Sequence, residues 1–235
     1  MILYKNKLMV RSKEGFPEEL EQQMDEMGDA HLGADTNTPL RSGAFDLNDD
    51  EKMAIIEEHF AEIMHTLGLD LSDDSLQGTP RRVAKMFVQE IFGGLDPARK
   101  PRISVFDNKY QYRRMLVEKN IDVTSTCEHH FLPIFGKAHV AYISSGKVIG
   151  LSKINRIVDY YARRPQVQER MTRQILEALK EALDTEDVIV MVDAKHMCVH
   201  ARGIQDTEST TVTVEYSGEF TDPDTRREFL DYVKA

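Results

Sequence analysis

The stretch MLVEKNIDVTSTCEHHFLPIFGKAHVAYI, residues 115–143, decides the fold. Residues 115–126 and 136–143 have the pattern of β-strands, and Ala138, Val140 and Tyr142 in the second segment alternate with other residues. Such alternation is typical of a strand with one buried face. Between the two segments lies CEHHFLPIFG, with one cysteine and two histidines. The stretch therefore predicts a strand pair whose connection contains reactive side chains.

Two helices and a second strand pair are predicted after this stretch. Ser152 is the predicted cap of a helix that reaches Tyr161, and Pro165 is predicted to open another. Residues 188–192 and 210–216 have the pattern of strands, and residues 223–233 that of a terminal helix. The second helix has apolar residues at helical spacing that we expect to face inward: Val167, Met171, Ile175, Leu176 and Leu179.

Two further helices are predicted before the stretch. Asp49 and Asp50 are candidate caps of the first helix, which Gly68 ends. The second has Thr79 as its predicted cap and Pro80 in its first turn, and it stops at residues 93–94, both glycine.

Residues 1–48 differ in composition from the rest of the chain. They are acidic, rich in turn-forming residues and poor in branched apolar residues, and a short helix over 18–27 is the one element that they suggest. We therefore predict a flexible acidic N-terminal arm over residues 1–48. A single catalytic domain over residues 49–235 follows, and it includes the helices of 49–94.

The order of the predicted elements indicates an α+β fold. A strand pair, a helix pair and a second strand pair follow two N-terminal helices, which favours an antiparallel sheet with helices on one face. The other face of such a sheet would lie open to solvent unless further copies of the chain covered it. We therefore expect an oligomer.

Composition excludes several classes of protein. The chain has 235 residues, of which 41% are hydrophobic and 30% charged, as in an ordinary globular protein. No apolar run approaches the roughly 18 residues of a membrane span, and the N-terminus has no signal-peptide pattern, so we expect a cytoplasmic protein. The net charge of −10 argues against binding of nucleic acid. Residues 1–50 contribute −6 of that charge, which leaves room for a local basic cluster elsewhere.

The two cysteines of the chain, Cys127 and Cys198, both lie near histidines. Cys127 and His130 have the C-x-x-H spacing with which one turn presents a thiolate and an imidazole to the same metal. His196 and Cys198 are two residues apart after a strand-like run, where an extended chain would point both to one face. Cys127, His130 and Cys198 are therefore candidate ligands of a catalytic zinc with an open position for water.

Two other interpretations of these residues stay open. The cysteines could be small buried hydrophobes beside surface histidines. Alternatively, a fourth protein ligand would close the coordination sphere and make the zinc structural. The candidates for that fourth ligand are His129, His196 and His200.

Two segments contain candidate substrate-binding residues. In GLSKINRIV, residues 150–158, Ser152 begins a helix whose first turn contains Lys153 and Arg156, and a helix N-terminus with two cations suits a phosphate group. Arg202 and Arg82 are candidates to join them. In RRPQVQE, residues 163–169, an amide and a carboxylate, Gln168 and Glu169, have the groups needed to bind the N–H edge of a guanine. Taken singly, each segment is better explained as an ordinary helix start, with solvated charges in the first and an acid that stabilises the helix dipole in the second.

Together these segments resemble the GTP cyclohydrolase I family. The motifs CEHH, GLSKINR, RPQVQE and H-x-C occur in that order, and matching stretches extend over nearly all of residues 79–204. The resemblance implies a tunnelling fold, two stacked pentameric rings, and active sites at the subunit boundaries. It implies zinc on Cys127, His130 and Cys198, where a zinc-activated hydroxide would attack C8 of the guanine of GTP.

The resemblance also implies roles for the other candidate residues. His129 would transfer a proton at the ring nitrogen, a task for a side chain that titrates near neutrality. Hydrolysis would release C8 as formate, and His196 and Ser152 would assist the later rearrangement to dihydroneopterin triphosphate. The purine edge would be held by Gln168 and Glu169. The triphosphate would be held by Lys153, Arg156, Arg202 and Arg82, some of them from a neighbouring subunit.

Two rival hypotheses belong to other classes. One is a non-catalytic module stabilised by zinc, which requires a fourth protein ligand and no guanine pocket. The other is a related tunnelling-fold enzyme, such as a nitrile reductase that acts on a deazaguanine. The nitrile reductase class uses a nucleophilic cysteine and lacks the zinc-binding pair of motifs found here.

Overall fold

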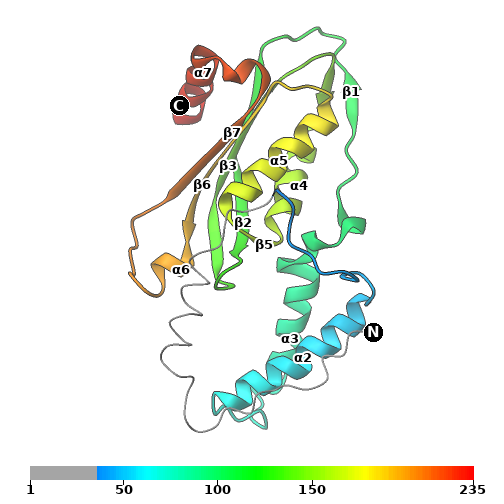
Figure 1. The fold of residues 1–235 in the computed structure, drawn as a ribbon, viewed down its shortest axis with the longest axis vertical. Helices are drawn as coiled ribbons and strands as arrows, with labels where there is room; N and C mark the ends of the chain where they lie inside the picture. Colours follow the sequence, from blue (N-terminus) through cyan, green and yellow to red (C-terminus); the bar gives the residue numbers. More distant parts are fainter. Residues whose placement is uncertain (1–35) are drawn as a thin grey trace. The chain divides into compact units, whose positions relative to one another are not determined.

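The computed structural model describes residues 36–235, and its centre is a five-stranded sheet (Figure 1). The strand order is β5-β2-β3-β6-β7. Neighbouring strands from β2 to β7 are antiparallel, whereas β5 pairs in parallel with the end of β2. The strands are β2 (Met115–Cys127), β3 (Pro133–Ile143), β5 (Pro165–Gln166), β6 (Val188–His196) and β7 (Thr211–Tyr216).

Two helices, α4 (Leu151–Ala162) and α5 (Gln168–Leu183), cover one face of the sheet. Their apolar sides pack against alternate residues of the strands, and Met171, Ile175 and Leu179 of α5 are fully buried. Burying a side chain of this size contributes about 1.5–3 kcal/mol relative to leaving it in water. The N-terminal end of α5, where the candidate base-binding residues lie, is therefore part of a firmly packed helix.

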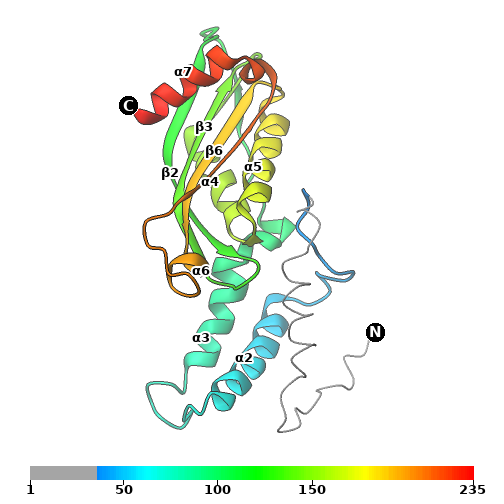
Figure 2. The same ribbon diagram turned by 60° about the vertical axis from the view of Figure 1, so that its left-hand side comes forward.

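The terminal helix α7 (Pro223–Lys234) packs on the opposite face of the sheet (Figure 2). Phe220 and Phe229 are fully buried there against Ala141 and Ile189, which point away from α4 and α5. The predicted pair of helices on one face is confirmed, and the terminal helix adds a smaller second core on the other face.

The two N-terminal helices are α2 (Asp49–Thr66) and α3 (Thr79–Lys85). Asn48 caps α2 in a reciprocal arrangement with Glu51, in which each side chain accepts from the other residue's backbone N–H. A π-helical segment, η1 (Met86–Ile91), continues α3, and two 3-10 turns follow, η2 (Gly93–Leu95) and η3 (Pro97–Arg99).

Gly94 is the point at which these helices meet the C-terminal end of α4. Its N–H donates to the carbonyl oxygen of Arg163 at 2.9 Å. A Cβ atom at this position would lie 2.0 Å from the carbonyl oxygen of Tyr160, so no side chain fits between the two backbones.

The remaining elements are short. Strands β1 (Val105–Asp107) and β4 (Lys147–Ile149) form a separate two-stranded sheet, and α6 (Met197–His200) and η4 (Gly218–Thr221) are single turns. Within residues 36–235, no helix has the length and apolar character that a membrane span requires.

Four predicted boundaries are wrong. Asn48, not Asp49 or Asp50, is the N-cap of α2, and the two aspartates lie in its first turn. Gly150, not Ser152, is the N-cap of α4, and Ser152 lies inside the first turn without a capping hydrogen bond. Pro165 does not open a helix: with Gln166 it forms β5 beside the end of β2, and α5 begins at Gln168. Thr79 is the first residue of α3 rather than its cap.

The predicted arm lies mostly outside the described residues. The predicted helix over 18–27 falls there entirely, and the boundary at residue 48 stays a prediction. The described part of the arm contacts the domain, because the Thr38 hydroxyl accepts hydrogen bonds from Arg164 at 3.2 Å and from Gln174 at 3.3 Å.

Candidate active site and metal centre

The motif CEHH forms a tight turn at the end of β2. The N–H of Phe131 donates to the carbonyl oxygen of Cys127 at 2.9 Å, and the N–H of Cys127 donates to the carbonyl oxygen of Leu132 at 2.8 Å. Phe131 has a φ of 54°, in the left-handed region that a bulky side chain rarely adopts. Strain of this kind collects at functional sites, where the surrounding structure holds it in place.

The turn brings Cys127 and His130 next to Cys198 of α6. The ligand atoms of these three residues all lie within 4.8 Å of one another, and they form the one such cluster among residues 36–235. The pairing of the strands explains why these residues meet. The register of β3 and β6 places Ile134, near the start of β3, opposite His196, at the end of β6. The turn before β3 and helix α6 after β6 therefore lie at the same end of the sheet.

The donor set of this cluster fits zinc. Zinc bonds of about 2.3 Å to sulfur and about 2.0–2.1 Å to imidazole nitrogen put the ligand atoms of a tetrahedral site about 3.5–4 Å apart. The cluster lies within that reach after small side-chain adjustments. Two thiolates and one imidazole leave a fourth position for solvent or substrate, as in catalytic rather than structural zinc sites.

The two thiols differ in acidity. Burial raises the pKa of Cys127, but hydrogen bonds from His196, from the backbone of His129 and from the side chain and backbone of His130 outweigh it and bring the pKa to about 5. Burial, followed by the neighbouring Cys127, raises the pKa of Cys198. Cys127 is therefore ionised at neutral pH, whereas Cys198 beside it needs a bound cation to lose its proton.

His129 lies between the cluster and a carboxylate. Its Nδ1 is 3.9 Å from the sulfur of Cys127, and its Nε2 is 3.9 Å from the Oε1 of Glu128. Glu128 in turn forms an ion pair with Arg170 of α5 at 2.5 Å. The His129 side chain keeps 42% of its exposure, so it is open to a substrate.

Gln168 and His196 form a partly buried hydrogen-bonded pair beside the cluster. The Oε1 of Gln168 accepts from the Nε2 of His196 at 2.8 Å. The amide nitrogen of Gln168 donates to the carbonyl oxygens of Val192 at 3.1 Å and Thr211 at 2.8 Å. The side chain of Gln168 is thus used within the subunit, where it ties α5 to β6 and β7.

The candidate phosphate-binding residues divide into separate groups. Arg202 lies beside the metal cluster, with its guanidinium 2.5 Å from the Nε2 of His130. Arg82, within α3, donates to the hydroxyl of Thr79 at 3.0 Å and to the carbonyl oxygen of Ser75. Lys153 lies in the first turn of α4, as does Ser152, which is exposed.

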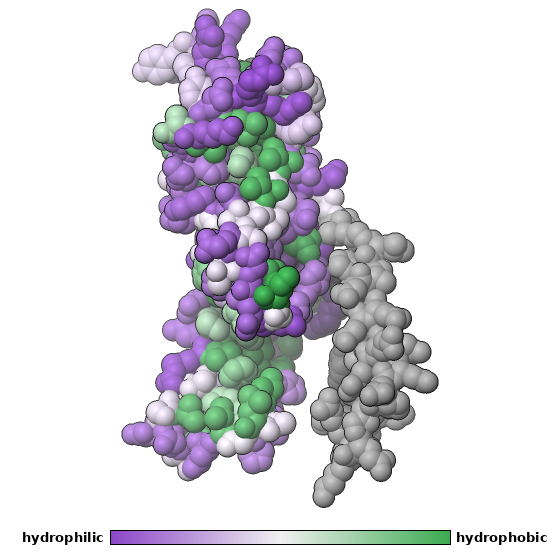
Figure 3. Space-filling model, turned by 90° about the vertical axis from the view of Figure 1, so that its left-hand side faces the viewer, coloured by the Kyte–Doolittle hydropathy of each residue, from purple (hydrophilic) through white to green (hydrophobic). Residues whose placement is uncertain are grey.

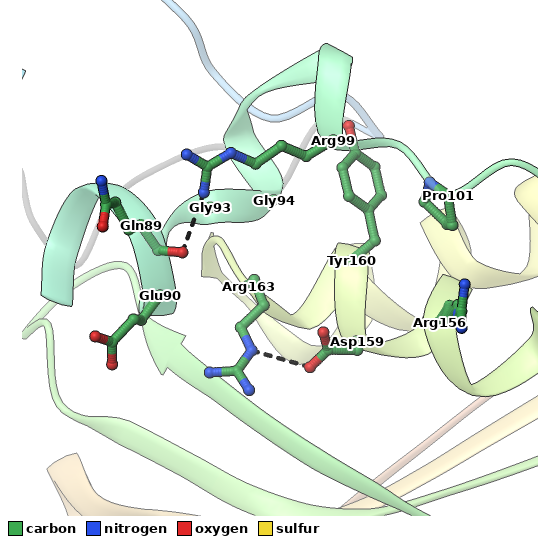
Figure 4. A pocket seen from close by; sticks show the side chains of 10 residues that line it. All are labelled: Gln89, Glu90, Gly93, Gly94, Arg99, Pro101, Arg156, Asp159, Tyr160 and Arg163. Carbon is green, nitrogen blue, oxygen red and sulfur yellow. Dashed lines mark hydrogen bonds and ion pairs between the residues drawn. The ribbon is translucent and has the colours of Figure 1, made fainter. Parts of the chain in front are cut away.

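Arg156 lines a pocket of about 550 Å³ between α4 and the η2–η3 segment (Figure 4). Arg163 and Arg99 lie on other sides of the same pocket and are engaged: Arg163 with Asp159 at 2.9 Å, and Arg99 with the carbonyl oxygen of Gln89 at 3.0 Å. Arg156 makes no ion pair with any residue of 36–235. No residue of the metal cluster lines this pocket.

Comparison with known proteins decides the family. The sequence profile of the family named GTP cyclohydrolase I matches residues 56–234. This chain belongs to the GTP cyclohydrolase I family. GTP cyclohydrolase 1 of Flavobacterium johnsoniae is 63% identical over 214 residues, which are 91% of this chain and 96% of that protein. GTP cyclohydrolase 1 of Aeromonas salmonicida is 56% identical over 199 residues, 84% of this chain and 90% of that protein.

A solved structure is a weaker match. The archaeosine synthase QueF-Like in its apo form is 22% identical to this chain, with a TM-score of 0.38 over 44% of this chain and 93% of that one. A likeness of this strength supports no conclusion about this member of the GTP cyclohydrolase I family.

The structure brings together the three predicted metal ligands of this GTP cyclohydrolase I family member, with His129 and Arg202 beside them. The expectation that His196 and Cys198 share one face of an extended chain is wrong, because the chain turns into α6 at Met197. His200 is not part of the cluster, and its Nδ1 is buried without a hydrogen-bond partner.

Sequence reasoning missed the ion pair of Glu128 and Arg170. Glu128 lies inside the motif CEHH, and Arg170 directly follows the motif RPQVQE, so each is next to residues with assigned roles. The position of Glu128 between a cysteine and two histidines was the available signal. The partner of Glu128 comes from 42 residues further along the chain, and no local pattern identifies it.

Proposed function

We propose that the chain converts GTP to 7,8-dihydroneopterin triphosphate with release of formate, the first step of pterin and folate synthesis. The observation that supports this most directly is the cluster of Cys127, His130 and Cys198, with three donors and room for a fourth, in a member of the GTP cyclohydrolase I family. Bound zinc would lower the pKa of a water to about 7 and so supply a nucleophile at neutral pH.

The residues around the cluster suit the proton transfers of the reaction. His129 is half-exposed beside Cys127, so it can reach both the cluster and a bound purine. We assign it proton transfer at the imidazole ring of the guanine. His196 and Ser152 would assist the later opening of the ribose and the closure of the new ring.

Base recognition falls to the start of α5. Glu169 is exposed in the first turn of α5, and its carboxylate can accept two N–H bonds from the edge of guanine. We propose that Gln168 also belongs to the base pocket. Its buried hydrogen bonds suggest that it contributes there mainly by holding α5 and His196 in position.

Triphosphate binding would use cations from more than one part of the assembly. Arg202 lies at the metal cluster, whereas Arg156 lines the separate pocket near η2 and Lys153 lies in the same helix as Arg156. Arg82 lies within the short helix α3. A site shared between two copies would join a metal cluster from one copy to the α4 cations of the next.

Exposed apolar residues support assembly into a homo-oligomer, which we propose is a decamer of two pentameric rings. Val212, Val214 and Tyr216 point to one side of the edge strand β7 and are 50%, 39% and 41% exposed. Exposed apolar residues also occur on α2, among them Ile55 and Ile63. Hydrophobic patches are visible both beside the strands and at the end formed by α2 and α3 (Figure 3).

We further propose that the protein works in the cytoplasm, with GTP as its small-molecule partner and without nucleic acid or membrane. Both cysteines are unpaired. A reducing compartment keeps such thiols available as metal ligands.

The deciding experiment is incubation of the purified protein with GTP, with formate and the fluorescence of oxidised neopterin as readouts, before and after removal of metal with a chelator. We expect both products to form in equal amounts and to disappear with the metal. The His129→Ala variant should keep the metal and lose turnover. A protein with a closed, four-ligand zinc would give neither product, and that result would favour the non-catalytic module.

A further inference from the structure

Arg170 and Glu128 form a buried, two-pronged ion pair between the base-binding helix and the metal-binding turn. One terminal nitrogen of Arg170 lies 2.5 Å from the Oε2 of Glu128, and the other lies 3.3 Å from its Oε1. The Arg170 side chain is 4% exposed and that of Glu128 is 20% exposed. Arg170 directly follows Glu169, and Glu128 lies between Cys127 and His129.

The energetics of such a pair favour a geometric role over a stabilising one. Burying two charges costs free energy that their attraction only roughly offsets, and apolar residues of the same size are often at least as stable. The bidentate guanidinium–carboxylate contact, however, fixes both distance and orientation. Such an ion pair is suited to fixing the position of one segment relative to another.

The two segments joined by the pair differ in how firmly they are held. Helix α5 is anchored by fully buried residues such as Met171 and Ile175. The turn is more exposed, since Phe131 keeps 52% of its accessible surface, and it includes one residue in the left-handed region. The pair therefore acts mainly on the turn. A backbone hydrogen bond from the N–H of Glu128 to the carbonyl oxygen of Gln166, at 3.0 Å, assists it.

We propose that Arg170 and Glu128 are positioning residues that set the place of His129 and the metal ligands relative to Glu169. The Oε1 of Glu128 lies 3.9 Å from the Nε2 of His129, so the same carboxylate also limits the orientation of that ring. The inference rests on the proposed function, because it assigns to the pair the alignment of the guanine ring, held by Glu169, with the groups that act on it.

The test compares Arg170→Gln, Glu128→Gln and the double variant, all loaded with zinc. Each single variant should lower kcat about 10- to 100-fold, the usual effect of losing a residue that orients a metal site. KM for GTP should change less than about threefold, because Glu169 stays on an intact helix. The kcat of the double variant should be no lower than that of the less active single variant, since both changes remove the same ion pair.

A matched control and a second variant separate alignment from folding. Lys180 forms an ion pair with Glu186 at 2.8 Å near the other end of α5, and Lys180→Gln should keep normal kcat. Arg170→Lys retains the positive charge but cannot make the bidentate contact, so its kcat should lie between those of the wild type and Arg170→Gln. If Arg170→Gln does not fold, Arg170→Lys alone tests the proposal, and normal kcat in it would overturn the idea.

One readout does not depend on turnover. Amide hydrogen exchange of the peptide over residues 127–132 should become several-fold faster in Arg170→Gln, while α5 stays protected. Equal exchange in the turn of variant and wild type would refute the positioning role even if GTP were not the substrate. Full turnover in both single variants would refute it as well. Absence of turnover in the wild type would instead contradict the proposed function.

Discussion

At the scale of single residues, the site places two cysteine sulfurs close together in a partly buried corner. Cys127 ionises readily, with a pKa of about 5, whereas burial and the neighbouring Cys127 raise the pKa of Cys198. Two thiolates within 4.8 Å repel each other unless a cation lies between them. The cluster therefore favours an ion that accepts both sulfurs.

Replacing Cys198 by Ser should remove both metal and activity. A hydroxyl does not ionise at neutral pH, so the site would lose one of its anionic ligands. We expect the zinc affinity to fall at least about 100-fold, given the size of zinc binding free energies in proteins. Atomic emission and a formate assay on the same preparation measure the two effects. Normal formate release from metal-depleted Cys198→Ser protein would contradict the assignment.

Replacing Glu169 by Gln should weaken recognition of the base. The variant keeps the shape of the side chain, but one acceptor oxygen becomes a donor that faces the N–H edge of guanine. A lost hydrogen bond to a charged group costs about 1.5–3 kcal/mol, which corresponds to a 10- to 150-fold loss in kcat/KM for GTP. The zinc content should be unchanged. Unaltered GTP affinity would remove Glu169 from the pocket.

Residue chemistry explains which parts of the site the sequence could predict. Ligand types and spacings are local, so the C-x-x-H turn and the second cysteine were recognisable as one candidate cluster. The partners of Gln168 and of Glu128 lie 24 to 43 residues away in the chain, and strand register decides which atoms meet. The substrate-binding roles of the candidate residues stay predictions.

At the scale of elements, β2 contains a bulge that is tied to a buried histidine. The pairing of β2 with β3 shifts between Glu118 and Ile121, and Asn120 has a φ of 62°. The N–H of Asn120 donates to the Nδ1 of His139 at 3.4 Å, so this nitrogen must be unprotonated. Burial lowers the pKa of His139. Lys119 and Lys137 add to this effect, and Asp193 opposes it.

This arrangement predicts a dependence of stability on pH. Above about pH 6.5 His139 is neutral in both the folded and the unfolded chain, and its contribution is fully present. As the pH falls through that value, the unfolded chain takes up a proton that folded His139 resists, so stability falls until the folded pKa is passed. Urea unfolding at fixed protein concentration, at pH 7.5 and 5.5, measures the effect. The loss on acidification should be smaller in His139→Asn, and an identical loss would contradict the prediction.

Element types were predictable from periodicity, but their ends depended on tertiary contacts. The helices α2 and α7 and the four long strands lie where the sequence predicts them. Pro165 has the local signal of a helix start, yet Gln166 is fully buried and pairs with Cys127, and this delays α5 to Gln168. Strand β6 runs on to His196 because β3 offers a partner along its whole length.

At the scale of the whole molecule, the apolar side of β7 should lie in a contact between copies. Val214→Lys would put a charge in that contact, so the assembly should shift to smaller species in light scattering, with activity reduced at least about tenfold if the site is shared. Tyr110→Lys is a matched control, since Tyr110 is 97% exposed and distant in sequence from β7. Unchanged mass for Val214→Lys would argue against an interface at this strand.

The close approach at Gly94 has a consequence for the pocket that contains Arg156. Gly94 itself lines that pocket, and main-chain atoms of Tyr160 and Arg163 lie directly against it. At this point the wall of the pocket is therefore backbone packed on backbone. Any side chain introduced at Gly94 would have to push α4 away from the η2–η3 segment, and so would reshape the pocket from its base.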